Sequence, residues 1–192
     1  MPRATTIRIS ILAVPLALAT PVLAHPGHGP ATLLAGLTHP FTGADHVLAM
    51  VAVGLWAALR GGKAVWVWPL AFVAAMLAGF ALAGAGIALP MVEPTILASV
   101  IVLGGLVAAG ARAPTAAGVV LVALFGLAHG YAHGVEGGGT AAFPFGFIVS
   151  TAALHLAGLG IGVGLARLNK SGLLRMLGLG VAAGGALLAF AG

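Results

Sequence analysis

Histidine is the residue type in this chain that could carry metal chemistry. Seven histidines accompany only three acidic residues, and the sequence contains no cysteine. Without thiolates, a bound metal ion would have to be held by imidazole nitrogen and carboxylate oxygen. These donors suit Ni, Cu, Zn, Fe or Co, so the histidines are the first candidates for a metal site.

Two groups of these residues have spacings that favour metal binding. His129 and His133 are four residues apart, so a helix would place both imidazoles on one face, about 6 Å apart along its axis. Asp45 and His46 place a carboxylate beside an imidazole. His39 precedes them, directly before a proline that disfavours helix at that point.

The other titratable residues carry weaker signals. His155 stands alone, and it could be a metal ligand or an interhelical hydrogen-bond partner. Glu93 lies between two prolines with no histidine nearby in the sequence, so we expect a loop residue rather than a ligand. His25 and His28 could form an external tail that collects metal, or a polar stretch with no such role.

The elements that carry these residues must lie in a membrane. The chain is 61% hydrophobic and 6% charged, whereas a soluble domain carries about 25% charged residues. Its apolar runs are too long and too many for one soluble core, so the solvent is the lipid bilayer. The basic residues are scattered singly, which argues against a nucleic-acid partner.

Residues 1–24 have the pattern of a secretory signal peptide. A start with two arginines precedes a short apolar stretch, and the small residue Ala24 gives a cleavage site. Cleavage would leave His25 at the mature N-terminus and a single transmembrane domain over residues 25–192. The alternative is an uncleaved anchor, but two prolines interrupt the apolar stretch, which would span the bilayer poorly.

The rest of the chain predicts an all-α, polytopic membrane bundle of about six transmembrane helices. Short breaks rich in glycine, proline and basic residues separate the apolar segments. We expect helices over residues 43–59, 64–86, 94–111, 115–133, 143–166 and 172–191. The first is short and could borrow residues 31–38, which would make a helix broken around His39 and Pro40. Broken helices recur beside the substrate sites of transporters.

The basic residues also predict the orientation. After residue 24, every lysine and arginine lies in or next to the first, third and fifth loops. The positive-inside rule therefore places these loops in the cytoplasm and the mature N-terminus in the periplasm. All histidines and acids would then lie outside the membrane or in its outer half to middle.

Small residues predict close packing between the helices. Gly158 and Gly162 share a small-xxx-small spacing, as do Gly160 and Gly164. In lipid this spacing lets helix backbones approach closely, and such glycine-rich faces could also support a homo-oligomer.

Three stretches of sequence resemble the HupE/UreJ family. They are the run from His25 to His28, the run from His39 to Gly54 that contains Ala-Asp-His, and Ala-His-Gly-Tyr-Ala-His-Gly-Val-Glu over residues 128–136, together with His155. That family consists of small bacterial inner-membrane proteins associated with hydrogenase and urease maturation and regarded as nickel permeases. The resemblance covers essentially the whole mature chain. It implies that nickel uptake is served by His39, Asp45, His46, His129, His133 and Glu136.

We therefore expect a Ni²⁺ permease of the bacterial inner membrane. The ion would be a transported substrate, and no prosthetic group is expected. Because ligating imidazole must be neutral, transport should fail as the pH falls below about 6.

Alternatives remain open at this point. Another divalent metal, such as Co, Cu or Zn, would suit the same ligands, since affinity order alone favours copper over nickel. A membrane accessory protein could bind metal without transporting it. An enzyme is disfavoured, because the sequence has no HExxH motif and no serine close to a histidine on one helix face.

Overall fold

A computed structural model describes residues 32–137 and 141–191, and all regular secondary structure in these two ranges is helical. The helices are α1 (Leu33–Thr38), the 3-10 helix η1 (His39–Phe41), α2 (Ala44–Arg60), α3 (Ala64–Gly84), α4 (Val92–Ala109), α5 (Thr115–Glu136), α6 (Ala142–Arg167) and α7 (Ser171–Ala191). The predicted all-α bundle is confirmed. The predicted signal peptide and both tail histidines, His25 and His28, lie outside the described residues.

The predicted break in the first span is also present. Five helices, α3 to α7, are each long and apolar enough to cross a membrane. A sixth span results if Leu33–Phe41 and Ala44–Arg60 are taken together, and these two parts are bent by 82°. Pro40 is the second residue of the 3-10 helix, and α2 has only 17 residues by itself, fewer than the roughly 20 that a span needs.

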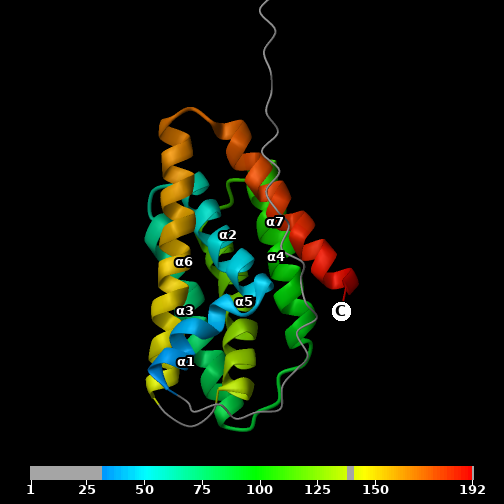
Figure 1. The fold of residues 1–192 in the computed structure, drawn as a ribbon. Coiled ribbons are helices and arrows are strands. Elements are labelled where there is room, and N and C mark those ends of the chain that lie inside the picture. The colour runs from blue at the N-terminus through cyan, green and yellow to red at the C-terminus, as the bar shows by residue number, and fades with distance from the viewer. Residues whose placement is uncertain (1–31, 138–140, 192) are drawn as a thin grey trace, which may run out of the picture.

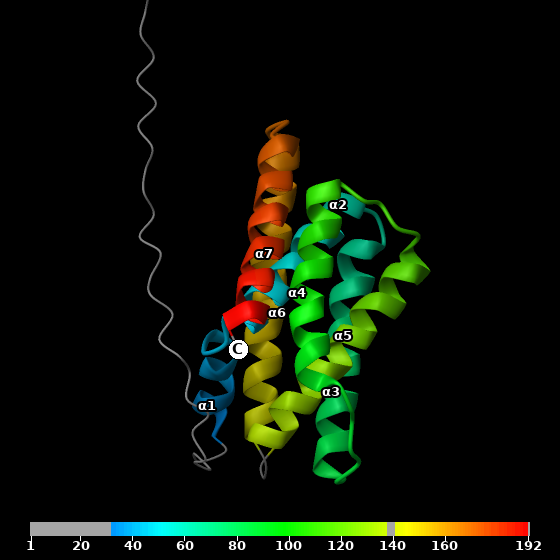
Figure 2. The same cartoon turned by 90° about the vertical axis from the view of Figure 1, so that its right-hand side faces the viewer.

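The chain reverses direction at each connection from α2 to α7, so the ends of the helices alternate between the two ends of the bundle (Figure 1). The principal contacts pair α2 with α6, α3 with α5 and α4 with α7. Both views place α1 at the end of the bundle where α5 finishes and α6 begins (Figures 1 and 2). The predicted metal residues on α2 and α5 therefore approach one another at that end.

Glycines bring the paired backbones into direct contact. A Cβ at Gly130 would overlap with the carbonyl group of Met76, and one at Gly158 would overlap with that of Val51. Of the four glycines on α6 with overlapping small-residue spacings, Gly158 and Gly162 face α2, whereas Gly160 and Gly164 face open space. Close packing of this kind replaces the hydrophobic driving force, which is absent between helices in lipid.

The opposite end of the bundle contains two stacked indoles. The rings of Trp56 and Trp68 lie 4.1 Å apart, and both side chains are fully or almost fully buried. Their Nε1–H groups donate to the carbonyl oxygens of Ala111 and Thr115, each at 2.9 Å. The Nε–H of Arg60 donates to Ala113 in the same connection. These bonds tie the α4–α5 connection to α2 and α3.

We expect the α3–α5 contact to be sensitive to a single methyl group. Gly130→Ala should lower the free energy of unfolding by about 1–3 kcal/mol, because the backbones must move apart. Gly160→Ala adds the same methyl group where nothing lies within 4 Å, and it should change stability little. Unfolding by denaturing detergent measures both variants, and equal stability would contradict the close backbone contact.

Candidate metal centre

The predicted metal residues come from two elements that meet at one end of the bundle. The broken first span supplies His39, Asp45 and His46, and α5 supplies the others. His129, His133 and Glu136 are spaced by four and three residues on α5, so they occupy successive turns of one face.

The expectation that Glu136 lies in a loop is therefore wrong. We predicted the helix to end at residue 133, but α5 continues through Glu136. The glycine at position 134 packs against Phe80 and Ala83 of α3, and this contact supports helix where the local sequence indicated a break.

Four imidazoles lie in direct ring contact. The ring centroids of His46 and His129 are 4.9 Å apart, as are those of His46 and His133. The ring of His39 lies 4.8 Å from that of His133. His46 therefore lies between the two histidines of α5, and the structure brings the two motifs together. We call His46, His129 and His133 the histidine cluster.

Hydrogen bonds at Nδ1 orient two members of this cluster. The Nδ1 of His129 lies 2.9 Å from the carbonyl oxygen of Phe125, which can only accept, so Nδ1 carries the proton. The Nδ1 of His46 lies 2.8 Å from the Asp45 carboxylate, which also accepts the backbone N–H of His46. In each neutral ring the lone pair is then on Nε2. A carboxylate or carbonyl behind an imidazole is the usual second partner of a metal-ligating histidine.

The remaining buried ring nitrogens of the histidines have no hydrogen-bond partner in the described residues. These buried atoms are Nε2 of His46, Nε2 of His129, and both ring nitrogens of His133 and of His155. His129 and His133 are completely buried. A buried polar atom without a partner costs about 1–3 kcal/mol, so structural hydrogen bonding does not account for these side chains.

The cluster is not a closed coordination shell. Among the described residues, no group of three or more histidine, aspartate and glutamate side chains has the arrangement of a formed metal site. The rings meet edge to face, so an ion shared by the cluster would require their nitrogens to turn toward it. Asp45 lies behind His46, where it orients the ring.

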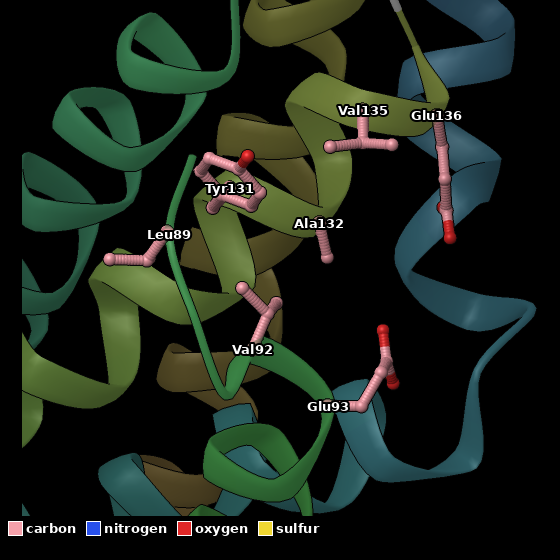
Figure 3. A pocket seen from close by; sticks show the side chains of 7 residues that line it. All are labelled: Leu89, Val92, Glu93, Tyr131, Ala132, Val135 and Glu136. Atoms are coloured by element: carbon pink, nitrogen blue, oxygen red, sulfur yellow. The ribbon is translucent and has the colours of Figure 1, made fainter. Parts of the chain in front are cut away.

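The outer edge of the cluster is polar and partly exposed. His39 Nε2 lies 2.8 Å from Glu136 Oε2, with the two side chains 24% and 57% exposed. Glu136 also lines a cavity of about 270 Å³ that contains Glu93, and Figure 3 shows both carboxylates facing the same gap. The expectation that Glu93 is a loop residue is wrong, because it lies in the first turn of α4. Because Glu93 is far from every histidine in the sequence, its place beside Glu136 could not be predicted.

His155 lies apart from the cluster, about midway along α6, and is 2% exposed. The ring of Phe72 is between the two, 5.3 Å from the ring of His129 and 5.1 Å from that of His155. The structure thus brings together all the predicted residues within its range except His155, which stands one aromatic ring away.

A multi-pass helical membrane protein with a cluster of buried imidazoles at one end is the class that this fold and site define. The comparisons with known proteins identify the family. The family model described as HupE / UreJ protein matches residues 12–188, and the chain therefore belongs to the HupE/UreJ family. It is 46% identical over 180 residues to "Protein HupE" of Rhizobium leguminosarum bv. viciae, covering 90% of this chain and 93% of that protein.

No solved structure matches this chain. Membership of the family confirms the resemblance drawn from the motifs. It supports a transport or accessory role in the membrane rather than a catalytic one.

The unpartnered nitrogens predict an unusual response to mutation. Without metal, His133→Leu should leave stability unchanged or raise it, because no hydrogen bond is lost. Ser150→Ala should lower stability by about 0.6–1 kcal/mol, because the Ser150 hydroxyl donates to the carbonyl oxygen of Leu37 at 2.6 Å and joins α6 to α1. Unfolding of both variants by denaturing detergent tests this contrast. A larger loss for His133→Leu would make that histidine structural.

Proposed function

We propose that the chain is a permease of the bacterial inner membrane that carries Ni²⁺ from the periplasm to the cytoplasm, where it supports the maturation of hydrogenase or urease. The observation that carries this proposal is the set of buried imidazoles with free ring nitrogens in a cysteine-free membrane bundle. Ionisable side chains within a span are costly and are retained for function. The family supplies nickel as the ion, since the ligand types alone suit several divalent metals.

The proposed path begins at the acidic cavity. Glu93 and Glu136 would attract the cation at the outer end of the bundle, where the cavity lies. Displacement of Glu136 from His39 would then bring the ion to the histidine cluster, in which Nδ1 bonds leave the lone pairs of His46 and His129 on Nε2. His155 would receive it nearer the middle of the membrane.

The orientation follows from charge. Arg60, Lys63 and Arg112 lie at the end of the bundle opposite the histidine cluster, and the positive-inside rule places that end in the cytoplasm. The cluster then opens toward the periplasm. The membrane potential alone could drive uptake, because moving two charges through about 100 mV yields roughly 4.6 kcal/mol.

Two other functions use the same site. The permease could carry Co²⁺, Cu²⁺ or Zn²⁺, because the site has no ligand that only nickel accepts. The protein could instead be a membrane accessory protein that binds metal without transporting it. Metal binding without metal uptake would indicate this function. Uptake of a panel of these ions into proteoliposomes separates the three functions.

We expect single substitutions in the site to abolish most transport. His46→Ala, His129→Ala and His133→Ala each remove one ligand, and Asp45→Ala removes the group that orients His46. Nickel uptake into proteoliposomes should fall at least tenfold, in line with the roughly 10–100-fold losses from changes in and around metal ligands.

Ser99→Ala is the matched control, since Ser99 is equally buried and bonds only to Ile96 of its own helix. It should transport at the wild-type rate. Wild-type rates in all four site variants would exclude the cluster from transport.

The acidic cavity predicts a different kinetic effect. Glu93→Gln should raise the KM for nickel uptake several-fold and leave the maximal rate nearly unchanged, because the carboxylate would concentrate the cation before the cluster binds it. The KM effect should shrink as salt screens the charge. Thr95→Ala, in the same turn of α4, is the control. A lower maximal rate with unchanged KM would place Glu93 in the transport step itself.

A further inference from the structure

Two methionines meet a polar side chain in the interior of the bundle. The hydroxyl of Thr151 on α6 lies 3.4 Å from the sulfur of Met50 on α2 and 3.8 Å from the sulfur of Met76 on α3. All three side chains are completely buried. Three different helices therefore direct two thioethers and one hydroxyl at the same point.

This point lies between the histidine cluster and His155. Met50 follows His46 by one helical turn on α2, and His155 follows Thr151 by one turn on α6, so each step is about 5–6 Å along its axis. Met76 is four residues from Phe72 on α3, and the Phe72 ring contacts both His129 and His155. Met50 and Thr151 thus lie between the histidine cluster and His155, and Met76 reaches the same point from α3.

The ring nitrogens of His155 supply an independent observation. Both are buried and have no hydrogen-bond partner in the described part of the chain. A hydroxyl bonded to sulfur is weakly satisfied, because a thioether is a poor acceptor. Packing alone requires neither the Thr151 hydroxyl nor the His155 imidazole, because apolar side chains such as Leu would fill the same volume.

We propose that Met50, Met76 and His155 form a second metal site, deeper than the histidine cluster, which takes a borderline or soft cation with Thr151 as a neighbouring oxygen donor. This inference rests on the proposed function, because the site would bind the transported ion after the histidine cluster. Thioether and imidazole donors accept Ni²⁺ and Cu⁺ but suit Mg²⁺ and Ca²⁺ poorly. The site is thus a second selection step, set by softness rather than by charge.

The sequence permits an unambiguous test. The chain has no cysteine and five methionines, so any sulfur bound to a metal must be a methionine thioether. X-ray absorption spectra of the full-length protein with two equivalents of Ni²⁺ should show a sulfur shell beside the nitrogen and oxygen shell. The shell should disappear in Met50→Leu/Met76→Leu. That double variant conserves volume, so the fold should survive.

Met91→Leu/Met176→Leu is the matched control, because both methionines are exposed and lie away from Thr151. This variant should retain the sulfur shell. Ag⁺, a soft cation, should bind at least tenfold more weakly to Met50→Leu/Met76→Leu and to His155→Leu than to the wild type. Size-exclusion profiles confirm that each variant is folded.

The outcomes separate this inference from the proposed function. Bound nickel with nitrogen and oxygen ligands only, or a sulfur shell that persists in Met50→Leu/Met76→Leu, overturns the second site and leaves the permease standing. A wild-type protein that binds no nickel at all overturns both. Loss of sulfur in the control variant would place the thioether ligand at the surface and also overturn the site.

Discussion

The hydrogen bond at Nδ1 is the interaction on which this site depends. It fixes the proton of His129 on the side of the Phe125 carbonyl and that of His46 on the side of Asp45. The lone pair of each ring is then on the buried Nε2, which has no hydrogen-bond partner among the residues that the structure describes. A buried acceptor without a hydrogen bond is costly. The fold tolerates this cost at several imidazoles that lie close together. A cation bound by the free lone pairs, as proposed above, would offset it.

Close backbone packing is what allows the cluster to exist. The α3–α5 and α2–α6 contacts are made through glycine at Gly130, Gly54 and Gly158, so the helices that carry the histidines are held at short range. Larger residues there would move α5 away from α2 and separate the rings. The same packing brings Met50 and Met76 to Thr151. The contacts that associate the helices therefore also position the candidate metal-binding side chains.

The two ends of the bundle differ in access. At one end His39 and Glu136 are partly exposed beside an acidic cavity. At the other, Trp56 and Trp68 are stacked and bonded to the α4–α5 connection. In the permease proposed above, an ion that leaves His155 for this end would have to pass the buried indoles or the helices that carry them.

The sequence by itself determined the helices and the candidate metal-binding side chains that they carry. Apolar runs gave the membrane helices to within about three residues, Pro40 indicated the broken first span, and the four-residue spacing placed His129 and His133 on one face. Those features depend on local backbone geometry and hydropathy, which neighbouring residues encode. Only the tertiary structure decided that Glu93 shares a cavity with Glu136. It also decided that α5 continues past Gly134 and that two methionines converge on Thr151. These features depend on contacts between helices that are far apart in the chain. The local sequence does not determine how such helices rotate and shift along their axes relative to one another.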